Sequence, residues 1–215
     1  MSIDELYTFL KYLSNKSQSG NLTPVQFNIS AERAQVEYFN KQYREYQKTR
    51  EVTDAISVWL VDSIINPDPT TGQVPYPSDY KHVAGVRHIR FVSGIATPVA
   101  VEEVTTNDLG TFLMSQVTPP TLKYPKMAYY NSYMLFAPKN VGAIQFDYFR
   151  QPVVPVWGYT VVNNRPVYNP ATSVNFEAVD SDLNEITFMM MSHLGIYLSS
   201  QQVVAYAEQM KTENV

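Results

Sequence analysis

The histidines of this chain are the residues whose type and spacing come nearest to a metal site. His82 and His88 lie six residues apart in a strand-like segment, and Glu102 or Glu103 could lie across a hairpin from them. Two imidazoles and one carboxylate form a known metal-binding set, which would allow a metal-dependent hydrolase. We favour the alternative, histidines at a surface or an interface, because this spacing places the two rings near one face without making them adjacent.

Other catalytic patterns are absent or have simpler explanations. The sequence contains no G-x-S-x-G, P-loop or G-x-G-x-x-G motif and no cysteine, which excludes disulfides, thiolate zinc sites and iron–sulfur clusters. Asp180 and Asp182 stand at a predicted helix start, where capping explains them. His193 stands at a predicted helix C-terminus, where the helix dipole favours a cation. We therefore expect no catalytic residue, no metal and no cofactor, and hence not an enzyme.

The charge composition argues against nucleic-acid and membrane binding. The chain has 16 Lys and Arg against 20 Asp and Glu, a formal net charge of −4, and no basic run, whereas nucleic-acid binders carry a basic patch. No apolar run approaches the ~18 residues of a membrane span, and no secretory signal opens the chain. We expect a soluble chain made inside the cell, without sequence-specific DNA binding and without membrane association.

Tyrosines are many and charges are few. Sixteen of the 215 residues are tyrosine, and 17% are charged, below the ~25% of a typical domain. Depletion of charge and enrichment of aromatic residues are typical of the centres of subunit interfaces. An aromatic core explains the same composition equally well.

The first 65 residues have the pattern of helices. Ser2 and Glu5 form a capping box before an apolar stripe, and Thr23 begins a second helix, with Pro24 in its first turn, that can continue to about Arg50. The apolar run of residues 52–65 predicts a third helix. The proline-rich stretch that follows marks a domain boundary.

The second helix is apolar on two sides, so it needs neighbours on both. We therefore expect Tyr38, Tyr43 and Tyr46 at a contact between copies of the chain. The two predicted stripes are Phe27, Ala31, Ala34 and Tyr38, and Val36, Phe39, Tyr43 and Tyr46.

Between the helical ends, the apolar period changes to two, which predicts strands. Residues 83–93 and 95–104 are β-branched runs, and 106–115 suit a short helix or a turn. Residues 130–136 and 144–148 alternate on either side of a linker of hairpin length. Residues 151–157 contain two prolines and suit at best an edge strand.

The chain ends as it begins, with helical patterns. Residues 183–194 carry one apolar face and end at Gly195, and a further capping box at 199–202 predicts a last helix. The sequence thus predicts an α+β fold: an α-helical bundle from the N- and C-terminal segments, with an inserted antiparallel β domain. We place the boundaries at 1–72, 73–178 and 179–215.

A projecting hairpin is predicted over residues 159–168. Asn163 and Asn164 suit its turn, and the segment shows little apolar alternation. Such a hairpin buries little against its own domain, so we expect Tyr159, Asn163, Asn164 and Tyr168 to contact a neighbouring subunit or the next component of an assembly. The last four residues lack an anchor and should be ordered only by a partner.

Several segments, in order, resemble one family. Pro77-Ser78-Asp79-Tyr80-Lys81-His82 is similar to the LP-x-D-Y-x-H turn of head-to-tail connector (ring or adaptor) proteins of short-tailed, crAss-like bacteriophages, with Tyr76 in place of the usual leucine. Residues 144–152 (IQFDYFRQP) resemble the family strand I-x-L-x-Y-Y-R-x-P. The resemblance extends over about residues 23–210 and includes 119–124, 133–138, 175–177 and 180–195.

The resemblance implies a structural virion protein and no enzyme. Its partners would be other copies in a homo-oligomeric ring, typically of about twelve, the portal protein, and adjacent ring or tail proteins. DNA would pass through the lumen, and the protein would be assembled in the bacterial cytoplasm and reside at the head-to-tail junction. A tail-tube, tail-completion or minor capsid protein is the alternative.

Overall fold

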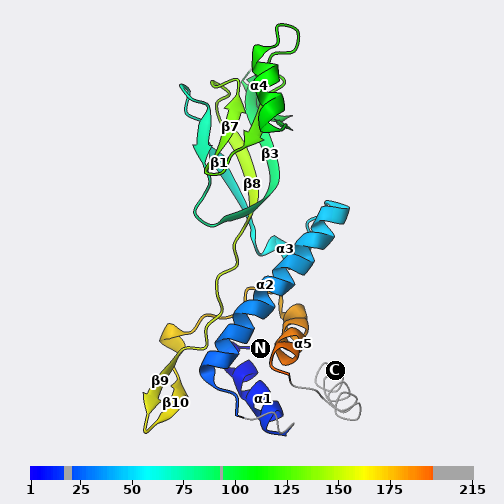
Figure 1. The fold of residues 1–215 in the computed structure, drawn as a ribbon. Coiled ribbons are helices and arrows are strands. Elements are labelled where there is room, and N and C mark those ends of the chain that lie inside the picture. Colours follow the sequence, from blue (N-terminus) through cyan, green and yellow to red (C-terminus); the bar gives the residue numbers. More distant parts are fainter. Residues whose placement is uncertain (17–20, 93, 196–215) are drawn as a thin grey trace. The chain divides into compact units, whose positions relative to one another are not determined.

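Helices and strands in similar measure make this an α+β protein. The computed structural model describes residues 1–16, 21–92 and 94–195. The chain divides into two compact units, which are unit 1 (Met1–Val58 with Pro152–Val215) and unit 2 (Trp59–Gln151) (Figure 1). The structural divisions fall after residues 58 and 151, whereas the predicted ones fall after residues 72 and 178. No helix in the described ranges is long and apolar enough to cross a membrane.

Unit 1 is built on helices that begin at their predicted caps. In α1 (Ile3–Lys16), the Ser2 and Glu5 side chains accept each other's backbone N–H at 3.3 and 2.7 Å, respectively. At the start of α2 (Pro24–Thr49), Thr23 and Gln26 form the same reciprocal box. Both predicted helix starts are confirmed. The unit also contains α3 (Asp54–Ser57), α5 (Leu183–His193), 3-10 helices at Pro170–Thr172 and Asp180–Asp182, and a two-stranded sheet of β9 (Tyr159–Val162) and β10 (Arg165–Tyr168).

The core of unit 1 forms along α2. This helix packs against α5, and its Phe27 meets Tyr7 of α1 edge to face, with ring centroids 5.2 Å apart. Each large side chain buried here contributes roughly 1.5–3 kcal/mol. The fully buried side chains of this core include Leu6, Leu10, Phe27, Tyr38, Phe39, Ile186 and Met190.

A buried glutamine joins α2 to the segment that precedes α5. Gln35 is 1% exposed. Its Nε2 donates to the carbonyl oxygen of Val153 at 2.6 Å, and its Oε1 accepts from the N–H of Glu177 at 3.1 Å. Because both ends of the amide are satisfied, its burial is tolerated, and the chain between residues 153 and 177, which includes the β9–β10 hairpin, is held to the helix at both ends.

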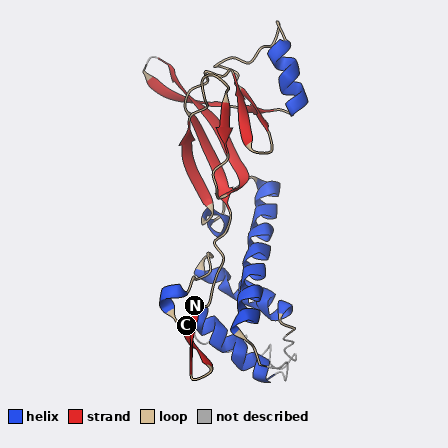
Figure 2. Ribbon diagram, turned by 60° about the vertical axis from the view of Figure 1, so that its left-hand side comes forward, coloured by secondary structure: helices blue, strands red, loops and turns tan. Residues whose placement is uncertain are grey.

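The larger sheet of unit 2 is centred on β8 (Ile144–Arg150). This strand lies between β1 (Leu60–Ile65) and β3 (Tyr80–Val92), and β4 (Ile95–Ala100) pairs with β3 at the edge (Figure 2). All these pairs are antiparallel, as predicted for the β domain.

The second sheet of unit 2 also has four strands. Its order is β2 (Gln73–Pro75), β7 (Tyr133–Ala137), β6 (Lys126–Tyr129) and β5 (Glu102–Glu103), and the β5–β6 pair is parallel. Helix α4 (Thr106–Met114) follows β5 and packs on β6, which decides between the predicted helix and turn in favour of the helix.

The two sheets of unit 2 share one apolar core. Ile144 and Phe146 of β8 cluster with Met127 of β6 and with Met134 and Phe136 of β7. All five are at most 1% exposed. Ile144, Phe146 and Tyr148 alternate along β8 with Gln145 and Asp147, so one face of the strand supplies the apolar side chains of this core, and five of the seven residues of β8 are buried.

Two predictions about local structure are wrong. Residues 52–65 do not form one helix, since α3 is a single turn and residues 60–65 form β1, paired with β8 from Leu60↔Phe149 to Ile65↔Ile144. Residues 138–142 do not close a hairpin, since β7 and β8 belong to different sheets. In the first case an apolar run was compatible with a helix or a strand, and in the second a linker of hairpin length joined strands of different sheets. A partner distant in sequence decided the structure in both cases. The helix predicted after residue 199 lies outside the described residues.

Candidate interaction surfaces

The histidines and glutamates considered for a metal site do not form one. His88 is 4% exposed, and its Nδ1 donates to the carbonyl oxygen of Leu122, 3.1 Å away. Burial lowers the pKa of the partly buried His82, which favours its neutral form. Glu102 pairs with Lys126. Within the described part of the chain, no three His, Asp or Glu side chains are grouped so as to hold a metal ion.

The acidic residues before α5 have a different role from the predicted one. Asp182 is the N-cap residue of α5 but forms no side-chain capping bond, because its carboxylate accepts a hydrogen bond from the Tyr38 hydroxyl. Asp180 lies 3.8 Å from the N-terminal ammonium and is 96% exposed, so this ion pair contributes little. The capping prediction is therefore wrong for Asp182. His193 does lie in the last turn of α5, where it contacts Glu37 at 3.0 Å.

A two-residue turn closes the hairpin of β9 and β10. Asn163 and Asn164 have φ angles of 49° and 58°, the left-handed values that a type I′ turn requires at both central positions. Asparagine adopts this conformation more readily than most residues. The strands pair from Val162↔Arg165 to Tyr159↔Tyr168, and the predicted turn is confirmed.

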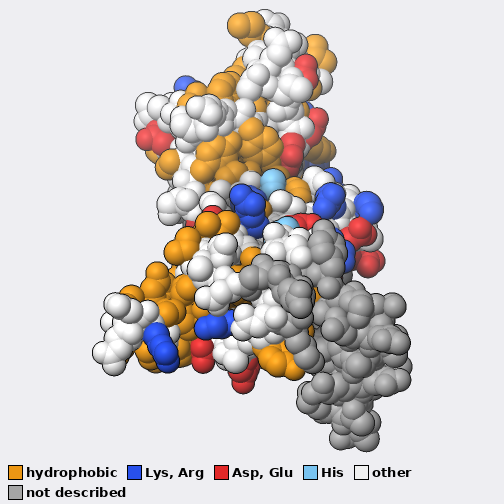
Figure 3. Space-filling view, turned by 60° about the horizontal axis from the view of Figure 1, so that its bottom comes forward, with side chains coloured by type: hydrophobic (Ala, Val, Ile, Leu, Met, Phe, Trp, Pro, Cys, Tyr) orange, Lys and Arg blue, Asp and Glu red, His pale blue; other side chains and the backbone are white. Residues whose placement is uncertain are grey.

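One face of this hairpin is apolar and exposed. Residues that oppose each other in an antiparallel pair share a face, so the register places Tyr159, Val161, Pro166 and Tyr168 on one side. We call these four residues the hairpin face. Tyr159 is 38% and Val161 is 66% exposed, and apolar side chains are visible on this part of the surface, at lower left in Figure 3. The sequence of either strand shows little apolar alternation, so this face is recognisable only from the pairing of the two strands.

Trp157 fixes the base of the hairpin. Its ring is 3% exposed and stacks on Tyr7 and Tyr159, with centroid distances of 4.0 and 5.7 Å. Its Nε1–H donates to Asp4 at 2.8 Å, and the side chain of Asn28 exchanges two hydrogen bonds with its backbone. The anchored base is therefore rigid, while every residue from position 159 to 167 is exposed.

The outer edge of β10 is closed to a further strand. Asn169 N–H donates to the Gly158 carbonyl oxygen at 2.8 Å, and hydrogen-bonded pairs alternate along an antiparallel ladder. This alternation turns the ring nitrogen of Pro166 away from β9. A proline at an outward position offers no N–H for strand addition. A partner of the hairpin would therefore meet its apolar face rather than extend β10.

The three tyrosines expected at a contact along α2 have different environments. In the single chain Tyr38 is fully buried and Tyr46 is 6% exposed, whereas Tyr43 is partly exposed. The expectation is corrected for Tyr38 and Tyr46, because both side chains are buried within the folded chain. The apolar side chains that α2 does expose are Val25, Ile29 and Val36, with exposed fractions of 57, 48 and 39%.

Comparison with known proteins adds no family to this geometry. No protein-family model matches the chain, and no curated protein matches it significantly in sequence. The function must therefore be inferred from the chain's own residues and surfaces.

Proposed function

We propose that this protein is a structural subunit of a phage virion, a member of the head-to-tail connector ring of short-tailed, crAss-like bacteriophages. The hairpin face is the observation that supports a structural role, because it is apolar, exposed and held by a buried base. The resemblance of residues 77–82 and 144–152 to the connector family supports the particular ring. In that role the protein would bridge the portal and the tail and would line part of the DNA exit channel.

The energetics of the hairpin favour a partner. A two-stranded hairpin is marginally stable by itself, and covering its apolar side chains stabilises it by about 25 cal/mol for each Å² removed from water. The formal net charge of −4 suits a channel through which DNA slides, because acidic walls repel phosphates.

Electron microscopy and mass measurement of the purified full chain test the proposal. We expect closed rings of about twelve copies, in which Val161 is covered by a neighbouring subunit or by the next component. A chain that stays monomeric at every concentration contradicts the proposal. An open tube would favour the tail-tube alternative, and a stoichiometric transition metal would favour the hydrolase.

A matched pair of variants assigns the hairpin contact. Val161→Asp places a charge on the hairpin face, and Thr160→Asp places the same charge on the opposite face of the same strand. We expect the first variant to lose the contact and the second to keep it. Equal behaviour of the two variants contradicts docking through the hairpin face.

A further inference from the structure

Charge is segregated along unit 2. Residues 80–101, which include β3 and β4, contain three Lys or Arg and no Asp or Glu. Residues 102–118, which include β5 and α4, contain three Asp or Glu and no Lys or Arg. Adjacent segments of one unit thus carry opposite charge, which is the condition for electrostatic complementarity between two copies.

The basic segment carries an exposed apolar tip. Phe91 is 68% and Ile95 is 69% exposed at the end of the β3–β4 pair. We call these two residues the β3–β4 tip. Arg90 lies next to the tip in the sequence and supplies the nearest cation.

The acidic segment carries a second exposed apolar surface. Leu113, Met114 and Val117 are 53, 87 and 90% exposed, and we call them the α4 patch. Leu113 and Met114 lie in the last turn of α4, and Val117 lies in the bend that follows, where its N–H donates to the Ser115 hydroxyl at 3.3 Å. The helix is fixed to its own unit, because Leu109 is 1% exposed and the Lys126 ammonium lies 3.9 Å from the Phe112 ring centroid. The α4 patch is therefore a defined surface rather than a loose end.

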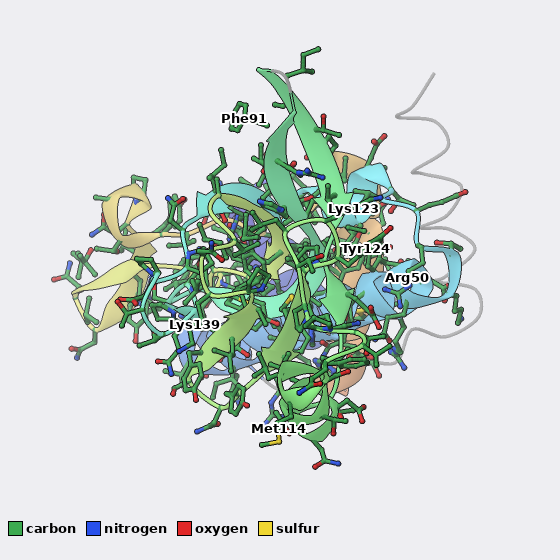
Figure 4. All side chains as sticks on the ribbon, turned by 90° about the horizontal axis from the view of Figure 1, so that it is seen from above. Arg50, Phe91, Met114, Lys123, Tyr124 and Lys139 are labelled. Atoms are coloured by element: carbon green, nitrogen blue, oxygen red, sulfur yellow. The ribbon has the colours of Figure 1, made fainter. Side chains whose placement is uncertain are left out.

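The two surfaces face in different directions. Seen from above, Phe91 and Met114 lie on opposite sides of unit 2 (Figure 4). Unlike surfaces on opposite sides of a subunit produce head-to-tail contacts, which close into a ring when the rotation between copies permits. A two-fold dimer would instead require one self-complementary surface.

A partner strand cannot pair along the whole free edge of β4. Ile89 N–H donates to Ala143 at 2.9 Å, toward β8, so its partner Pro98 on β4 turns its ring nitrogen outward. This proline interrupts the free edge of β4. Contact at this end is therefore left to side chains.

We propose that the β3–β4 tip of one copy packs on the α4 patch of the next copy, with Arg90 facing the acidic Glu103 and Asp108. This inference rests on the proposed ring and identifies the residues of its repeating contact. Apolar packing supplies the larger part of the stabilisation, and the charges set the orientation and the partner.

Two variants of the full chain test this contact. Phe91→Asp with Ile95→Asp alters only the β3–β4 tip, and Met114→Asp with Val117→Asp alters only the α4 patch. All four positions are more than two-thirds exposed, so both variants should fold, which circular dichroism checks. We expect each to need at least about tenfold more protein for assembly than the unchanged chain. Ile64→Asp, on a β1 residue that is 64% exposed, is the control and should still assemble.

Mixing the two variants gives the decisive result. One intact tip and one intact patch remain, so the mixture should form a 1:1 pair of twice the chain's 24.5 kDa and grow no further. Rings formed by either variant, no pair on mixing, or an equal loss in Ile64→Asp each overturn the contact. If the unchanged chain itself forms no ring, the proposed function fails, whereas rings from all the variants refute only the contact.

Discussion

Strand β8 and the β9–β10 hairpin contain similar types of residue, but these residues are buried in β8 and exposed in the hairpin. Both are rich in aromatic and β-branched side chains, yet five of seven residues in β8 are buried and all four in β9 are exposed. The difference is a covering layer, because β8 lies beneath the sheet of β6 and β7, whereas among the described residues no second layer covers the hairpin face. An apolar strand that the described part of its own chain leaves uncovered is a surface on which another molecule can bind.

The largest expected effect contrasts the two regions directly. Phe146→Ala in β8 should lower the free energy of unfolding by about 3–5 kcal/mol, because a fully buried ring leaves a cavity. Val161→Ala in β9 should change it by less than about 0.5 kcal/mol. Urea unfolding followed by circular dichroism measures both variants. A similar loss in the two would mean that the hairpin is packed within its own chain.

The anchor of the hairpin should respond more like β8. Trp157→Ala should cost about 3 kcal/mol, since the ring is buried and stacked on Tyr7. Trp157→Phe keeps an aromatic ring but loses the hydrogen bond to Asp4, so it should cost about half as much. Thermal unfolding distinguishes the variants. Equal costs would show that the hydrogen bond, not the stacking, holds the base.

A smaller effect on stability is expected at Gly158, which lies beside Trp157 and close to the backbone of Thr172. A Cβ on Gly158 would lie 2.6 Å from the backbone carbon of Thr172, so Gly158→Ala should cost roughly 1–3 kcal/mol. Gly110 in α4 has open space around it, and Gly110→Ala should stabilise the helix by about 0.5–1 kcal/mol. Denaturant unfolding measures the change in the free energy of unfolding for both variants, which should be a loss for Gly158→Ala and a gain for Gly110→Ala. Changes of the same sign would contradict the steric argument.

The smallest effect concerns the turn. Asn164→Gly relieves a left-handed residue at the second central position of the type I′ turn and should stabilise the hairpin by a few tenths of a kcal/mol. Amide hydrogen exchange should slow in β9 and β10 and stay unchanged in β8, which serves as an internal reference. Slower exchange throughout unit 2 would contradict a local effect.

Features that depend on neighbouring residues were predictable from the sequence. The capping boxes at Ser2 and Thr23 and the turn at Asn163-Asn164 each involve groups two or three positions apart, so the residue types alone specify them. The α+β class followed from the change of apolar period along the chain.

Only the tertiary structure decided which surfaces are free. Leu60 pairs with Phe149 and Asp182 accepts from Tyr38, and contacts across such separations leave no periodic signal in the sequence. For this reason residues 60–65 became a strand, Tyr38 and Tyr46 became interior residues, and the hairpin face appeared from two segments with no evident alternation. Local bonds are encoded in adjacent residues, whereas burial depends on what the rest of the chain brings to the same place.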